Sequence, residues 1–132
     1  MKLNKSKTFG IFVPIYKAMV IVSYNTSQDT LIKALKKDEV CDEKDILMFE
    51  LAKEEYAPTP KGAITIEMGS VFIVDISKHD NIYSLHNTIA HELFHVVHLL
   101  LEQKGFKLTD ESQEAYSYLI GYLTEEIYRE WT

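Results

Sequence analysis

Three histidines and one glutamate lie within an otherwise apolar run of eleven residues, Thr88-Ile-Ala-His-Glu-Leu-Phe-His-Val-Val-His98. Burying that many titratable groups on one helix is costly unless something binds them. His91 and His95 are four residues apart, so on a helix they lie on the same face and can aim ring nitrogens at one ion. Glu92 is rotated to the side, where it can reach a water bound to that ion. The segment therefore predicts a metal site in which Glu92 is the general base.

A catalytic zinc ion usually has three protein ligands and one open position, so a third ligand is needed. His98 follows on the same helix, but the axial rise from His91 is about 10 Å, which is too long for one ion with bonds of about 2 Å. Glu114 comes nineteen residues after His95 and lies level with it if the next helix packs back antiparallel. Glu111 is the alternative, although acids in a first helical turn are commonly placed there by the helix dipole.

Two imidazoles and one carboxylate suit Zn²⁺, and they would also accept manganese, iron or cobalt. The predicted reaction is hydrolysis of a peptide bond by a zinc-activated water, with Glu92 taking the proton of the water and handing it to the leaving amine. A binding module that docks to a protein partner without cleaving it is the alternative of another class. A structural zinc clip is a third interpretation, and it would need a fourth protein ligand.

The elements that must position this helix are predicted from periodicity and turn chemistry. Residues 9–24 are rich in β-branched and aromatic types and predict a strand pair or one long strand, with Pro14 at an edge or bend. Residues 26–29 offer caps for a short helix that ends near Lys37. Residues 44–56 suit a short buried helix, which we favour, or a central strand.

The second half of the chain carries clearer signals. After a loop at 58–62, the runs 63–68 and 71–76 flank Gly-Ser and predict a β-hairpin. A long helix is expected from about Ile82 to about Gln103. Gly105 would be its left-handed C-cap, with Phe106 packing back. Thr109 or Asp110 is then expected to cap a last helix that carries apolar residues at 116, 119, 120, 123 and 127.

Length and charge limit the class of protein. A chain of 132 residues forms one domain, residues 1–132, and the pattern predicts an α+β fold: an N-terminal mixed or antiparallel sheet with a β-hairpin, then two packed antiparallel helices that carry the metal site. The net charge of -6 argues against nucleic acid as the main partner. Lys33, Lys36 and Lys37 are expected to form a solvated helix face.

Compartment is predicted from the cysteine count and the N-terminus. Cys41 is the only cysteine, so no disulfide can form within the chain, and its acidic neighbours disfavour a reactive thiolate. Three lysines precede the apolar run 9–24, as in a signal peptide, but Pro14 and Lys17 interrupt that run. We therefore predict a cytoplasmic protein that acts on a peptide or protein, with no membrane partner.

His91-Glu92-Leu-Phe-His95, followed by Glu114-Ala115-Tyr116, resembles the gluzincin branch of the zincin metallopeptidases. The resemblance spans residues 63 to 118 and implies a zincin-like domain with His91, His95 and Glu114 as zinc ligands and Glu92 as general base. It also implies that the strand 71–76 is an edge that binds substrate as an added strand. The small size and the run 114–122 are similar to short metallopeptidases encoded by bacteriophages and mobile elements.

Two features depart from larger gluzincins. Those proteins hold the first histidine with an acidic residue four positions after the glutamate ligand, where this chain has Tyr118. They also supply a distant oxyanion donor, for which this chain offers several candidates without a choice among them: Tyr116, Tyr118, Tyr122, His79 and His86. The alternative role of the three tyrosines is packing in the core. The alternative role of the two histidines is a surface position or a helix cap.

Overall fold

A computed structural model describes residues 1–37, 42–55 and 62–132, with the backbone alone for 52–55. In chain order the elements are β1 (Lys7–Val13), the short 3-10 helix η1 (Pro14–Tyr16), β2 (Ala18–Tyr24), α1 (Gln28–Lys37), α2 (Glu43–Glu55), β3 (Ala63–Met68), β4 (Val71–Ile76), α3 (Ile82–Gln103) and α4 (Gln113–Trp131). The two hairpin strands and the helix α3 match their predicted bounds, and α1 ends at Lys37 as expected. Residues 9–24 form a strand pair, and α2 is the helix that was favoured for its segment. The predicted loop at 58–62 and Cys41 fall, apart from Gly62, outside the described residues.

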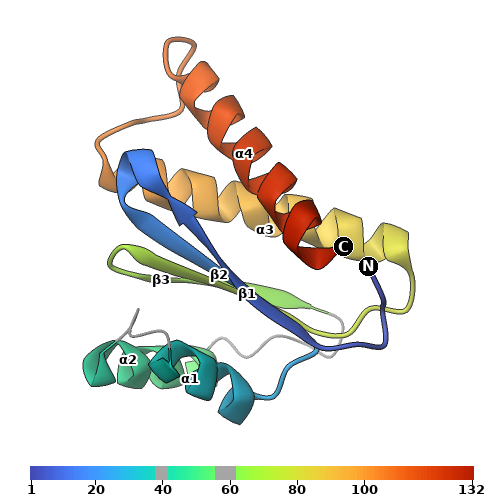
Figure 1. The fold of residues 1–132 in the computed structure, drawn as a ribbon. Helices are drawn as coiled ribbons and strands as arrows, with labels where there is room; N and C mark the ends of the chain where they lie inside the picture. The colour runs from blue at the N-terminus through green and yellow to red at the C-terminus, as the bar shows by residue number, and fades with distance from the viewer. Residues whose placement is uncertain (38–41, 56–61) are drawn as a thin grey trace.

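Four strands form one mixed sheet in the order β1-β2-β4-β3. The pairs β1–β2 and β3–β4 are antiparallel, whereas β2 and β4 pair in parallel across the segment that contains α1 and α2. Figure 1 shows α1 and α2 on one face of the sheet and α3 and α4 on the other. The α+β class and the mixed sheet are thereby confirmed.

The strand order corrects one expectation. The strand 71–76, expected at an edge, is β4 and lies in the centre of the sheet, and the edge beside it is β3. All six residues of β4 are buried, because helices cover both faces of the sheet. A strand buried on both sides is a continuous apolar run, as Val71-Phe-Ile-Val is here. Of the two hairpin strands, β3 is therefore the one whose outer edge is available for pairing.

Local chemistry explains the turns. Pro14 opens η1, where its missing N–H has no partner to lose, and Lys17 closes that turn with a φ of 50°. Gly69 begins the two-residue hairpin turn with a φ of 60°. Gly105 has a φ of 85°, and the N–H of Phe106 donates to the carbonyl of Leu101 at 2.9 Å, which completes the expected C-cap of α3.

Apolar residues form a core on each face of the sheet. On one face, Ile21 and Ile73 pack with Leu31 and Leu35 of α1 and with Phe49 of α2. The larger core on the other face joins β1, β2 and β4 to the buried faces of α3 and α4. Lys33, Lys36 and Lys37 are exposed on α1, as expected.

The last helix differs from expectation at its start. It begins at Gln113 after Ser112, whose side chain caps no helical N–H, so neither Thr109 nor Asp110 is the cap. Figure 1 shows α4 running back in the opposite general direction to α3, but the two helices cross. The C-terminal half of α4 lies against the N-terminal half of α3, where Tyr128 contacts His86. The first turns of α4 stand away from α3.

No helix in the described part of the chain is both long enough and apolar enough to cross a membrane.

Candidate metal and catalytic site

Glu92 occupies a core position on α3. The buried face of this helix includes Leu85, Ile89, Glu92 and Val96, spaced by three or four residues. Glu92 is 6% exposed, so a carboxylate stands where the helical period would place an aliphatic side chain. A buried carboxylate needs hydrogen-bond partners, and the structure supplies one from the sheet.

The edge strand β3 supplies that partner. The Thr65 hydroxyl donates a hydrogen bond to Oε2 of Glu92. Farther along the same pair of elements, the side-chain amide of Gln103 donates to Glu67 and to the carbonyl of Gly69, both at 2.7 Å. The Thr65 contact lies at one end of the interface between α3 and β3, and the Gln103 contacts lie at the other. Together they fix the position of Glu92 relative to the edge strand.

His91 and His95 lie side by side next to Glu92. Their Nε2 atoms are 3.1 Å apart, and the ring centroids are 4.8 Å apart in an edge-to-face arrangement. Both histidines are exposed. The structure therefore brings together the two predicted histidine ligands and the predicted base, as the i, i+4 spacing required.

These three side chains line one hollow with a volume of about 360 Å³ between α3 and β3. Ala63, Ile64 and Thr65 form its strand side, and His98 and Leu99 extend its helix side. The hollow therefore combines a titratable cluster with a strand whose outer backbone edge is not paired within the sheet.

His98 has other partners. Its Nε2 lies 3.2 Å from Oε2 of Glu102, and its ring stacks on Phe94 with an interplanar angle of 7°. Although His98 lines the hollow, these contacts hold its ring along its own helix. This agrees with the expectation that the helical rise separates His98 from the ligand pair.

Glu114 is not brought to this hollow. It is exposed near the start of α4 and lines a different hollow with Ser117, Tyr118 and Gly121. The inclined crossing of the helices is the physical reason, because it carries the first turns of α4 away from α3. Glu111 is exposed in the turn before α4. Within the described residues, no group of three or more His, Cys, Asp or Glu side chains is arranged to hold a metal ion. The assignment of Glu114 as a ligand stays a prediction.

The donor pair itself fits a zinc ion. Two zinc–nitrogen bonds of about 2.0–2.1 Å at a tetrahedral angle place the nitrogens about 3.3 Å apart. The observed separation of the two Nε2 atoms is 3.1 Å. His91 and His95 could hold zinc through these atoms with little movement of either ring.

The candidate oxyanion donors lie elsewhere. Tyr116 is buried, as expected, and its hydroxyl points to the carbonyl of Phe106. Tyr118 is 77% exposed, and Tyr122 is exposed and donates to the carbonyl of Phe12 at 2.8 Å, so the expectation that these two belong to the core is wrong.

The two remaining histidines are also engaged. His79 is 2% exposed, against the expectation of a surface position. Its ring nitrogens lie 2.7 Å from the carbonyl of Ser77 and from the hydroxyl of Thr88. The ring of His86 stacks on Tyr128. Neither of these two histidines, nor any of the three tyrosines, lines the hollow that contains Glu92.

Thr65 is the site residue that sequence reasoning missed. In β3, Ile64, Ile66 and Met68 pack toward α1 and α2, so Ala63, Thr65 and Glu67 face α3. Two polar residues on a strand face that must pack against an apolar helix were the available signal.

Fold and site together define an α+β domain in which a paired-histidine hollow with a buried glutamate lies against the edge of a mixed sheet. No protein-family model, no curated protein and no solved structure matches this chain.

Proposed function

We propose that the chain is a zinc-dependent metallopeptidase of the zincin type, acting on a peptide or protein in the cytoplasm. The observation that carries the proposal is the placement of three side chains. The Nε2 atoms of His91 and His95 lie 3.1 Å apart, and the buried carboxylate of Glu92 lines the same hollow against β3. His91 and His95 would hold zinc, with Glu114 as the predicted third ligand. When bound, zinc supplies a Lewis acid that polarises the scissile carbonyl and acidifies water.

Glu92 then has the role of proton carrier. Its carboxylate accepts a proton from the attacking water and passes it to the leaving amine, so that one side chain serves both halves of the reaction. The hydroxyl of Thr65 donates to Oε2, which keeps the carboxylate in one orientation. The other carboxylate oxygen of Glu92, Oε1, would accept the hydrogen bond from the attacking water.

The edge strand β3 is the proposed substrate platform. It pairs with β4 on one side, and Ala63 to Thr65 border the hollow on the other. An extended peptide that adds to this edge would bring its backbone past Glu92 with main-chain hydrogen bonds and little demand on its sequence. This assigns to β3 the role that the sequence resemblance implied for the strand 71–76.

A non-catalytic binding module is the second candidate, and one observation favours it. The described residues contain no group of three metal-ligating side chains around His91 and His95. A domain with this incomplete site could keep the fold and bind a protein partner at the same edge strand.

A Glu92→Gln variant tests the first proposal. We expect the purified wild-type protein to carry about one zinc ion per chain and to cleave members of a peptide mixture made from digested cellular protein, read by mass spectrometry. Glu92→Gln should lose at least about 10²-fold in rate while its zinc content is unchanged. Glu130→Gln, an exposed glutamate of α4, is the control. A wild-type protein that binds zinc but cleaves no peptide would support the binding module. A wild-type protein that binds no zinc would contradict the peptidase proposal.

A further inference from the structure

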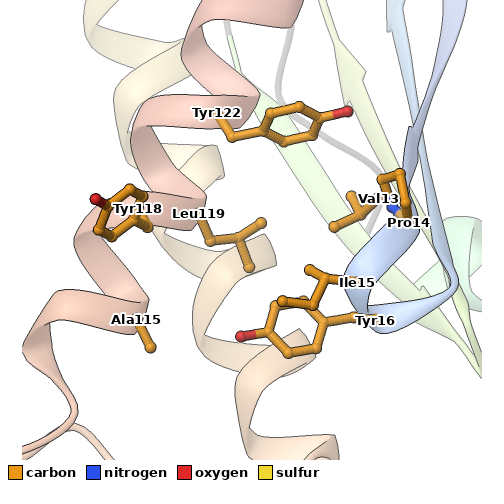
Figure 2. A pocket seen from close by; sticks show the side chains of 8 residues that line it. All are labelled: Val13, Pro14, Ile15, Tyr16, Ala115, Tyr118, Leu119 and Tyr122. Carbon is orange, nitrogen blue, oxygen red and sulfur yellow. The ribbon is translucent and has the colours of Figure 1, made fainter.

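A second hollow lies away from Glu92, between the turn that joins β1 to β2 and the helix α4. Its volume is about 470 Å³. Figure 2 shows Leu119 and Tyr122 reaching from α4 toward the turn, and Ile15 and Tyr16 reaching back from η1. None of the residues that line it lines the hollow with the two histidines. We call it the apolar hollow.

The apolar hollow is exposed and preformed. Ile15 is 80% exposed and Tyr118, at the α4 rim, is 77% exposed. Single exposed apolar residues are common, but a cluster of large apolar side chains at the surface marks an interaction site. The hydroxyl of Tyr122 donates to the carbonyl of Phe12 at 2.8 Å, which ties α4 to β1. Because this contact fixes both walls, a ligand need not order them on binding.

An acidic hollow adjoins it on α4. Tyr118 and Tyr122 line both hollows, and beyond them lie Glu114, Ser117, Gly121 and Glu125. No lysine or arginine is among the residues that line either hollow. Arg129 binds Glu125 at 2.6 Å, whereas the Glu114 carboxylate forms no hydrogen bond or ion pair with another described residue. The unpaired negative charge is therefore that of Glu114.

Gly121 gives independent support. It lies inside α4, where glycine costs about 1 kcal/mol relative to alanine. A Cβ built at Gly121 would meet nothing within 4 Å, so packing inside the protein does not require glycine here. The missing side chain leaves the floor of the acidic hollow open to a ligand backbone.

We propose that the two hollows form one docking site for a peptide segment of a protein partner that presents a large apolar side chain close to a lysine or arginine. The apolar side chain would enter between Ile15 and Leu119, and the cation would lie over Glu114. This role and the predicted role of Glu114 as a zinc ligand exclude each other, because one carboxylate cannot lie in both hollows. A second copy of this chain fits poorly, because a two-fold contact would bring the same acidic hollow against itself. Anionic lipid and nucleic acid are disfavoured for the same electrostatic reason.

The test selects ligands from a displayed library of random dodecapeptides on the full chain carrying Glu92→Gln, which prevents hydrolysis. Enriched peptides should share a large apolar residue within a few positions of lysine or arginine. Binding of one labelled peptide is then measured by fluorescence anisotropy. Ile15→Asp should weaken it about tenfold or more. Ser117→Lys should weaken it about threefold, and by less in high salt. Ser117 is used because Glu114 is also the predicted zinc ligand.

Matched controls lie on α3. Tyr83→Asp adds the same charge at a large apolar residue that is 83% exposed, close to the 80% of Ile15. Asn87→Lys adds the same charge as Ser117→Lys at another exposed position, and neither control should change binding. Enrichment of acidic peptides, no enrichment, or equal binding by Ile15→Asp would overturn the proposal. Loss of binding in a His91→Ala/His95→Ala variant would also overturn it, because the peptide would then occupy the other hollow. A concentration-dependent dimer that Ile15→Asp dissociates would assign the surface to a second copy instead.

Discussion

The contact between Thr65 and Glu92 makes the sharpest prediction. Thr65→Val keeps the shape and the β-branched character of the residue in β3 but removes the hydroxyl that donates to Glu92. Glu92 is 6% exposed, so its carboxylate cannot easily replace this donor with water. Hydrogen bonds to charged groups contribute about 1.5–3 kcal/mol. We expect the free energy of unfolding to fall by about that amount, which for a chain of this size lowers Tm by about 5–12 °C.

The assay is thermal and urea unfolding of the purified variant, with Thr65→Ser as the matched control. Serine keeps the hydroxyl, so it should recover most of the lost stability. In a Glu92→Leu background, where there is no carboxylate to satisfy, Thr65→Val should be neutral or stabilising. If Thr65→Val unfolds like the wild type, or if Thr65→Ser is equally damaged, the hydrogen bond does not hold Glu92 and our account of the site is wrong.

Three further predictions concern metal, helix and pH. Glu114→Ala should lower bound zinc in mass spectrometry of the native protein, whereas Glu111→Ala should not; equal zinc in both variants would exclude Glu114 as a ligand. Gly121→Ala should raise the free energy of unfolding by about 1 kcal/mol in urea, because its Cβ meets nothing and alanine favours the helix; a loss of stability would show an unseen close contact. Burial raises the pKa of the Tyr128 hydroxyl above its ordinary value of 10.0. The unfolded chain therefore releases this proton first, and stability falls as pH rises through 10.0 toward the folded-state pKa. Tyr128→Phe should lose less stability than the wild type between about pH 9 and about pH 11.

The local elements were readable from the sequence because each depends on neighbours along the chain. The hairpin followed from two runs rich in apolar residues around Gly69-Ser70, and the α3 helix from its 3.6-residue period and the glycine at 105. The side-by-side placement of His91 and His95 followed as well, since four residues on a helix fix their relation whatever the rest of the fold does. Glu92 beside them was equally determined.

Relations between elements were decided by tertiary packing. The parallel pairing of β2 with β4 placed β4 in the centre and β3 at the edge. The continuous apolar run of β4 fits burial on both faces, but it does not determine which strand pairs with β4. The contact of Thr65 with Glu92 depends on that order. The crossing of α4 over α3 is set by how their buried faces interlock, and it placed Glu114 in another hollow. The same crossing exposes Tyr118 and Tyr122, which together with the β1–β2 turn create the apolar hollow.

The sequence by itself thus determined the histidine pair and its base, because they share one helix. The surroundings of that pair depend on distances between elements far apart in the chain, and only the folded structure fixes those distances.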